Sequence, residues 1–222
     1  MDCIRKETMR ESAPLNRVWK EWLNCTVWLT ASLVSTYLIM NYDFKPGMLG
    51  PRQTHWPTDT TLVRSSERPT VVAFLHPRCV CTRATVKQLI RTLKFHEGAD
   101  VIAALFVPLD IVDHRVWEEG EYVKTIRAEM PAAHVIFDRG GSEAKRFGAF
   151  TSGTILAYDR EGKEIFRGGI TDRRGGEKGN PGLERLASIV TGKASSFHTG
   201  RTPVFGCPLV LPNALEKNGG AQ

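Results

Sequence analysis

The chain has 222 residues, of which 41% are hydrophobic and 24% are charged, a size that fits one globular domain with accessory segments and excludes a second full domain. The formal net charge is +6, but Lys and Arg are interleaved with Asp and Glu and form no run of five or more, which argues against nucleic-acid binding. The five cysteines are an odd number and do not form the pattern of a disulfide scaffold.

Residues 23–40, LNCTVWLTASLVSTYLIM, contain no charged side chain. As a helix this run is about 27 Å long, close to the thickness of the hydrocarbon core of a bilayer. A buried core helix would normally have a polar face, whereas this run has only scattered Thr, Ser and Asn. We therefore expect one transmembrane helix in contact with the lipid bilayer. Aromatic residues flank it as they do at membrane interfaces: Trp19, Trp22 and Trp28 at one end, Tyr37 and Tyr42 at the other.

The charges around this run predict its orientation. Basic residues are more frequent before it than after it, so the positive-inside rule places residues 1–22 in the cytoplasm. The C-terminal part is then periplasmic or otherwise extracytoplasmic, where dithiols can be held oxidised. No small-x-small cleavage site stands clearly after the run, so we expect an uncleaved anchor rather than a signal peptide. The basic residues are Arg5, Lys6, Arg10, Arg17 and Lys20 before the run, and Lys45 and Arg52 after it.

Three further segments follow the apolar run. Residues 41–69 contain four prolines and little periodicity, and are predicted to form a linker. Residues 70–192 carry strand and helix signals and are predicted to form an α/β domain. The tail, residues 193–222, contains Cys207 and is irregular and polar except for TPVFGCPLVLP, an apolar stretch that we expect to dock on the domain.

The α/β domain begins with a strand, a helix and a strand. TVVAFL (70–75) and VIAALFVPL (101–109) are β-branched, apolar runs of strand length. Between them, residues 82–95 have apolar side chains at helical spacing. This order predicts a parallel strand pair joined by a right-handed crossover.

The rest of the domain is predicted to add a helix, a strand, a short helix, a hairpin and a closing helix. The glycine-rich residues 168–182 lack the Lys-Ser/Thr ending of a P-loop and are expected to form a long flexible loop near the active face. The predicted elements are helix 114–129, strand 134–138, helix 142–148, strands 154–159 and 163–169, and helix 181–191.

Cys79 and Cys81 come directly after the first predicted strand and directly before the first predicted helix. A thiol there meets unpaired backbone N–H groups and the positive end of the helix dipole, both of which favour the thiolate. Arg78 and Arg83 strengthen this effect if their side chains turn toward the sulfur. The position therefore predicts a reactive thiolate.

The spacing of the cysteines leaves their pairing open. Side chains two residues apart on a helix do not face each other, so a Cys79–Cys81 disulfide requires Cys79 to lie outside the first turn. Alternatively, Cys79 pairs transiently with a partner protein or with Cys207 in the tail. A lone buried thiol is an equally good interpretation of Cys207.

The motifs VVAFLHPRCVC and FTSGTILAYDREGKEIFRGG resemble the thioredoxin-like superfamily, in particular the membrane-anchored TlpA and ResA-like branch. Phe74 precedes Cys79 by five positions, as in the thioredoxin-type entry, although only Val80 separates the two thiols. The motifs HP-x-CxC-TRA, TSG and GGIT resemble the RedB-like group of bacterial membrane-anchored proteins. The resemblance covers roughly residues 70–210 and implies a thioredoxin-like mixed sheet flanked by helices and preceded by one transmembrane helix.

The resemblance also implies a site and an activity. Cys79 would act as the nucleophile, and Cys81 or Cys207 would resolve a mixed disulfide with a partner protein that carries a disulfide or dithiol. No cofactor is needed for this reaction. The hairpin comparison implies a substrate groove lined by Ser152, Gly153 and Thr154, with Ser152 as a hydrogen-bond donor, and it puts Ser152 or Gly153 at the family's cis-proline position.

A metal-binding module is the alternative function. His76, Cys79, Cys81 and Cys207 offer soft ligands suited to copper or zinc. Against this alternative, His76 precedes Pro77, a position that favours a role in closing the turn. A docking subunit with no chemistry of its own is a third hypothesis.

Overall fold

A computed structural model describes residues 15–94, 98–111, 113, 115–193 and 201–210. The chain divides into two compact units, Met1–Asp43 and Phe44–Gln222. Parts of the predicted cytoplasmic segment and of the tail, including Cys3, lie outside the described residues.

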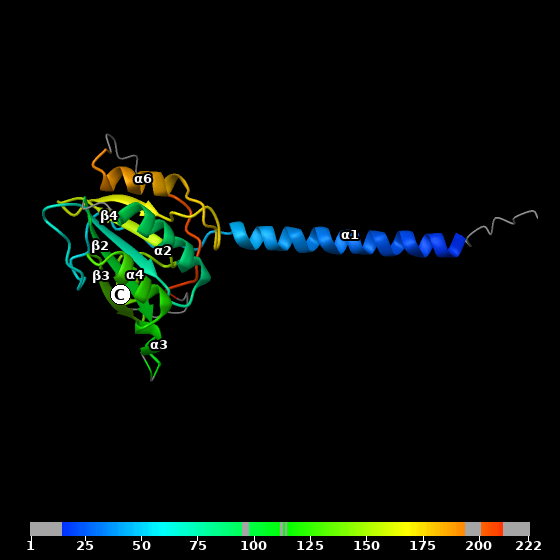
Figure 1. Cartoon of the computed structure of the whole chain (residues 1–222), viewed down its shortest axis with the longest axis horizontal. Helices are drawn as coiled ribbons and strands as arrows, with labels where there is room; N and C mark the ends of the chain where they lie inside the picture. The colour runs from blue at the N-terminus through cyan, green and yellow to red at the C-terminus, as the bar shows by residue number, and fades with distance from the viewer. Residues whose placement is uncertain (1–14, 95–97, 112, 114, 194–200, 211–222) are drawn as a thin grey trace, which may run out of the picture. The chain divides into compact units, whose positions relative to one another are not determined.

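The first unit consists of the apolar N-terminal helix. Helix α1 (Leu15–Phe44) is longer than the predicted span, and its part Arg17–Phe44 is long and apolar enough to cross a membrane. None of this segment is buried. Figure 1 draws the helix in blue. A membrane anchor and a signal sequence near the N-terminus both have these properties.

The second unit is built on a five-stranded mixed sheet with the order β3-β2-β1-β4-β5. The parallel strands β1, β2 and β3 are joined by helical crossovers, as the strand-helix-strand pattern predicts. Strands β4 and β5 form the predicted antiparallel hairpin, and β4 pairs with β1. The strands are β1 (Thr70–Leu75), β2 (Asp100–Val107), β3 (His134–Arg139), β4 (Thr154–Tyr158) and β5 (Glu164–Gly168).

Five helices accompany this sheet within the described residues. The predicted helix 114–129 is in fact two helices, α3 and α4, separated at Gly120. Gly120 has an extended backbone and caps α4, which agrees with the low helix propensity of glycine. The helices are α2 (Val80–Leu93), α3 (Arg115–Glu118), α4 (Glu121–Glu129), α5 (Ser142–Arg146) and α6 (Pro181–Val190).

The strands send alternate side chains into two cores. On one face of β1, Val71, Ala73 and Leu75 pack against apolar residues of α2, α4 and α6, the helices drawn over the sheet in Figure 1. On the other face, Val72 and Phe74 pack against α5 and against segments that precede β1 and follow α6. These segments and α5 contribute Leu62, Ala144, Phe147, Leu209 and Val210 to the second core.

The predicted linker contacts the domain along much of its length. The Gly47 N–H donates a hydrogen bond to the Val204 carbonyl at a distance of 2.7 Å. The Trp56 ring meets Phe147 edge-on at 5.1 Å and Tyr158 at 5.0 Å between centroids. These contacts tie the segment before β1 to the second core.

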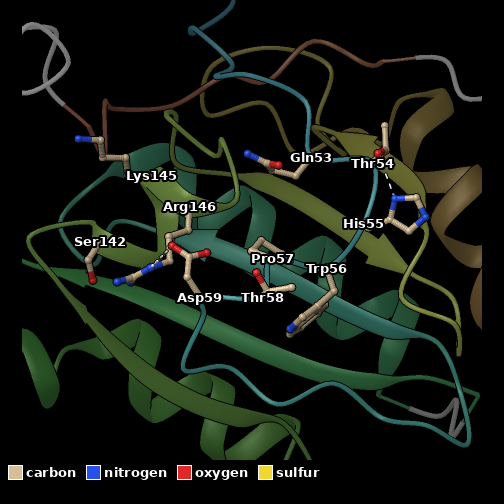
Figure 2. Close-up of a pocket in the computed structure, with 10 residues that line it drawn as sticks. All are labelled: Gln53, Thr54, His55, Trp56, Pro57, Thr58, Asp59, Ser142, Lys145 and Arg146. Carbon is tan, nitrogen blue, oxygen red and sulfur yellow. Dashed lines mark hydrogen bonds and ion pairs between the residues drawn. The ribbon is translucent and has the colours of Figure 1, made fainter. Parts of the chain in front are cut away.

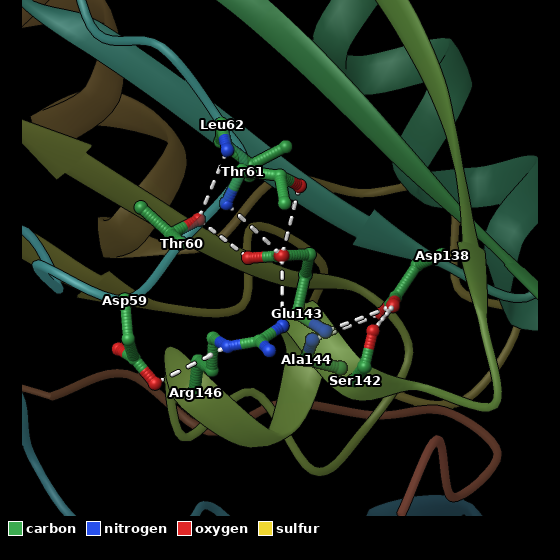
Figure 3. A network of polar contacts seen from close by, with 9 residues as sticks. All are labelled: Asp59, Thr60, Thr61, Leu62, Asp138, Ser142, Glu143, Ala144 and Arg146. Atoms are coloured by element: carbon green, nitrogen blue, oxygen red, sulfur yellow. Dashed lines mark hydrogen bonds and ion pairs between the residues drawn. The ribbon is translucent and has the colours of Figure 1, made fainter.

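A buried carboxylate on α5 holds the same segment. Glu143 is only 4% exposed and accepts hydrogen bonds from the hydroxyls of Thr60 and Thr61. It also forms an ion pair with Arg146 at 2.9 Å. Asp138 caps the start of α5 through the Glu143 N–H at 2.8 Å, as Figure 3 shows. The network joins the chain before β1 to the end of β3.

The sheet order and the flanking helices give the second unit a thioredoxin-like α/β fold, as predicted. In this fold α2 begins shortly after the carboxyl end of β1, and Cys79 and Cys81 lie at this junction.

Candidate functional site

Cys79 lies at the junction of β1 and α2. It caps α2 with an extended backbone (φ −98°, ψ 124°), and its carbonyl accepts from the Thr82 N–H at 3.0 Å. Its N–H donates to the His76 carbonyl at 3.0 Å, which closes the turn after β1. Cys79 is therefore the N-cap residue of α2, at the helix start where the sequence predicts it.

Cys207 lies directly against this cysteine. The Cys207 and Cys79 sulfurs are 3.0 Å apart although 128 residues separate them in the chain. The two cysteines are not joined by a disulfide in this structure, whose S–S bond would be about 2.05 Å long. Cys81 is buried in the first turn of α2. The structure thus brings together all three cysteines predicted for the site.

The Cys79 thiol is strongly acidic in this environment. A hydrogen bond from the Cys81 thiol, with further hydrogen bonds from the Cys207 thiol and from the backbone of both residues, lowers the pKa of Cys79 to about 4, against the opposing effect of burial. At neutral pH this sulfur is a thiolate, which is the reactive form.

The two neighbouring thiols stay protonated. Donation of its hydrogen bond to Cys79, together with burial, raises the pKa of Cys81 far above its usual range. Burial, assisted by the hydrogen bond to Cys79, raises the pKa of Cys207 to about 11. Arg174 acts in the opposite direction on both thiols through its positive charge. The site therefore consists of one thiolate that accepts hydrogen bonds from two thiols.

A segment that we call the C-terminal strap, residues 202–210, holds Cys207 in place. It runs antiparallel to the loop before β4. The Ser152 N–H donates to the Cys207 carbonyl and the Leu209 N–H donates to the Phe150 carbonyl, each at a distance of 2.8 Å. Arg174 donates to the Gly206 carbonyl, also at 2.8 Å. This part of the tail docks on the domain, as predicted from its apolar sequence.

Gly206 sits at the closest approach of the strap to the loop. A Cβ atom at this position would come within 2.0 Å of the Ser152 carbonyl oxygen, which belongs to the backbone. Only glycine fits there, because a rigid backbone atom cannot move aside. The residue next to Cys207 is therefore fitted to this contact.

Ser152, Gly153 and Thr154, predicted to line a substrate groove, are all buried. The Ser152 hydroxyl accepts from the His76 N–H at 2.9 Å and lies 3.0 Å from the Thr82 hydroxyl. Gly153 has a positive φ of 89° and donates to the Phe74 carbonyl at 2.8 Å. These residues join the loop to β1 and α2, and their predicted role toward a substrate stays a prediction.

His76 turns toward aromatic side chains. Its ring stacks on Phe106 at 5.3 Å and meets Trp117 edge-on at 5.4 Å, while its Nδ1 accepts from the Arg78 N–H at 3.2 Å. Burial lowers the pKa of the ring. Among the described residues, no group of three or more His, Cys, Asp or Glu side chains is arranged to hold a metal ion. The copper or zinc alternative therefore stays a prediction, and in this structure the His76 ring contacts aromatic side chains.

Two side chains contribute to the site in ways that the sequence patterns did not specify. Arg174, from the predicted flexible loop, reaches the strap, and Trp117, from α3, receives the Arg78 guanidinium over its ring at 5.5 Å. The two consecutive arginines in the glycine-rich loop were the available signal for the first. The sequence offered no comparable signal for Trp117.

A surface pocket of about 660 Å³ lies away from the cysteines. It is bounded by the segment 53–59 and by Ser142, Lys145 and Arg146 of α5, as Figure 2 shows. Arg146 crosses it to pair with Asp59 at 3.2 Å. None of its lining residues is a cysteine.

Comparisons with solved structures give similarity at low sequence identity. A hypothetical protein from Sinorhizobium meliloti has a TM-score of 0.50 at 19% identity, covering 76% of this chain and 97% of its own. An uncharacterized conserved protein from Geobacillus kaustophilus has a TM-score of 0.51 at 18% identity, covering 76% and 93%. A secreted disulfide oxidoreductase from Mycobacterium tuberculosis, described as homologous to Escherichia coli DsbE, has a TM-score of 0.38 at 12% identity, covering 58% and 83%.

No family model matches the chain, and no curated protein matches it either. The first two structural similarities support the fold alone. The chemistry of the site therefore has to be argued from the residues that form it.

Proposed function

We propose that the chain is a membrane-tethered thiol-disulfide redox protein in which Cys79 and Cys207 form a reversible disulfide. The observation that carries this proposal is the 3.0 Å contact between the two sulfurs. The long apolar helix at the N-terminus supports the tether, with the domain on the extracytoplasmic side, where dithiols can be held oxidised. The motifs shared with the RedB-like group agree with this assignment.

The reaction is an exchange with a partner protein. In the reduced chain, Cys79 and Cys207 carry two electrons and the partner carries a disulfide; in the oxidised chain, the Cys79–Cys207 bond is formed and the partner has become a dithiol. The reverse direction transfers the same two electrons from partner to chain. Both half-reactions pass through a mixed disulfide between one sulfur of the chain and one of the partner.

Cys81 has a different role in this proposal. Its thiol donates a hydrogen bond to the Cys79 sulfur, which stabilises the thiolate. Because a low pKa stabilises the reduced form, it also makes the Cys79–Cys207 bond easier to reduce. Cys81 thus adjusts the potential of the couple without entering the disulfide.

A redox titration of cysteine variants tests the proposal. The full chain, with Cys3 and Cys25 replaced by serine, is equilibrated in glutathione buffers of stepped potential, quenched with acid and counted for free thiols. We expect a two-electron transition in this background that Cys79→Ser and Cys207→Ser each abolish and Cys81→Ser preserves at a shifted midpoint. Loss of the transition in Cys81→Ser, with full retention in Cys207→Ser, would overturn the pairing.

A further inference from the structure

The three sulfurs of the site differ in their exposure to solvent. Cys79 is 1% exposed and Cys81 is 6% exposed, so both lie below the surface. Cys207 is only partly buried. Thiol-disulfide exchange requires direct contact between the attacking sulfur and the sulfur under attack. Cys207 is therefore the cysteine of the three that a partner reaches with the least rearrangement of the domain.

The strap explains why Cys79 is covered. Its backbone pairs with Phe150 and Ser152, and its own side chains Val204, Phe205 and Leu209 are buried. For a partner sulfur to reach Cys79, the strap would have to separate from this loop and expose those apolar side chains. The route through Cys207 avoids that cost.

We infer that partner proteins attack the oxidised chain at the Cys207 sulfur, and that Cys79 is the internal leaving group. This inference rests on the proposed Cys79–Cys207 couple. A partner thiolate attacks the Cys207 sulfur, a bond forms between these two sulfurs, and the Cys79–Cys207 bond breaks with its electron pair going to Cys79. The second thiolate of the partner then attacks its own sulfur in the mixed disulfide. This releases the partner as a disulfide and Cys207 as a thiolate, which takes up a proton.

The pKa values of the two cysteines also favour attack at Cys207 with Cys79 as the leaving group. A thiolate leaves faster when its pKa is lower, and Cys79 has a pKa of about 4 against about 11 for Cys207. The Cys79 sulfur receives the negative charge, and Cys81 already donates hydrogen bonds to it. Attack at Cys79 would instead expel the more basic thiolate of Cys207.

Trapping the first mixed disulfide with reduced glutathione tests the inference. The oxidised full chain, with Cys3 and Cys25 replaced by serine, is mixed with glutathione, and after the quench the released thiol is alkylated in denaturant. Samples are acid-quenched at the earliest times, and the modified cysteines are assigned by mass spectrometry. We expect glutathione on Cys207 and the alkyl group on Cys79, in about tenfold or greater excess over the reverse pattern, because access and leaving-group basicity both favour it.

Two further arms separate the possible outcomes. The same experiment in a Cys81→Ser background removes the other thiol able to move glutathione after the attack, and should give the same assignment. Glutathione chiefly on Cys79, or equally on Cys79 and Cys207, would overturn the inference while leaving the couple in place. Failure of the oxidised chain to contain a Cys79–Cys207 bond would instead overturn the proposed function.

Discussion

At the scale of single residues, the acidity of Cys79 depends on a neighbour that cannot pair with it along a regular helix. Cys81 lies two positions further on, yet its thiol is the leading cause of the lowered pKa of Cys79. This is possible because Cys79 caps α2 with an extended backbone, outside the first turn. The single intervening residue, Val80, is 77% exposed, so the turn directs its two sulfurs inward and the valine outward.

Replacing Cys81 by alanine should make Cys79 less acidic. Loss of a hydrogen bond to a charged group costs about 1.5–3 kcal/mol, which corresponds to a rise of about one to two pH units in the midpoint of thiolate formation. The midpoint is measured on the reduced chain as the pH dependence of thiolate absorbance, with Cys25→Ala on α1 as the control. An unchanged midpoint in Cys81→Ala would show that the Cys81 thiol does not stabilise the thiolate.

The same lowered pKa predicts a pH dependence of stability for the reduced chain. A thiol whose pKa is lower in the folded state stabilises that state fully above its unfolded pKa and progressively less as the pH falls toward about 4. We expect the free energy of unfolding, relative to Cys79→Ala, to shrink over this range. Urea denaturation of both reduced proteins at stepped pH measures the difference, and a constant difference would contradict the thiolate assignment.

At the scale of elements, the strap and the loop before β4 act together to position Cys207. Substitution Gly206→Ala places a methyl group against the Ser152 carbonyl, and we expect it to push the strap away from the loop. Formation of the Cys79–Cys207 disulfide should then slow by about tenfold or more, because the sulfurs lose their alignment. The measurement is the rate of thiol loss after addition of oxidised glutathione.

Gly120→Ala provides a matched control for that substitution. Its Cβ would make only ordinary contacts, the nearest at 3.8 Å, and Gly120 lies between α3 and α4, outside the strap contact. Its rate of disulfide formation should equal that of the unaltered chain. Equal rates in Gly206→Ala and Gly120→Ala would show that the strap does not position Cys207.

The segment before β1 belongs to the same scale, because Glu143 on α5 holds it. Substitution Glu143→Gln removes the charge that accepts from Thr60, Thr61 and Arg146. We expect a loss of about 1–3 kcal/mol in the free energy of unfolding, measured by urea denaturation. The exposed substitution Glu67→Gln should change it by less than about 0.5 kcal/mol, and a similar small effect of Glu143→Gln would contradict the structural role of the network.

At the scale of the whole molecule, much of the fold follows from local patterns. Strands β1 and β2 are apolar runs of the right length, and the hairpin of β4 and β5 flanks a recognisable turn, so their positions were predictable. The interruption at Gly120 was not predicted, because the helical periodicity continues through it. The thiolate position at the start of α2 was also predictable, since a strand followed directly by a helix fixes it.

The partner of Cys79 was not predictable in the same way. Sequence spacing left Cys81 and Cys207 as alternatives, because the choice depends on how residues 202–210 dock on a loop fifty residues earlier. That docking rests on a backbone contact at Gly206 and on a hydrogen bond from Arg174, neither of which produces a periodic signal. Tertiary packing decides such contacts.

The N-terminal helix predicts where the whole molecule resides. If α1 is an uncleaved anchor, the full-length chain should sediment with membranes, resist extraction by alkaline carbonate and retain the N-terminal residues that precede α1. Membrane fractionation combined with intact-mass measurement checks this. A soluble chain that begins after the apolar run would show that the helix is a cleaved signal sequence.

Disulfide mapping of the oxidised chain tests the central claim most directly. Trypsin releases residues 79–83, CVCTR, and residues 202–217, TPVFGCPLVLPNALEK, so the two peptides carry all three site cysteines. After free thiols are blocked with N-ethylmaleimide, the account predicts these peptides joined by a disulfide, with fragmentation placing the blocking group on Cys81. An internal disulfide within CVCTR, with the blocking group on Cys207, would contradict it.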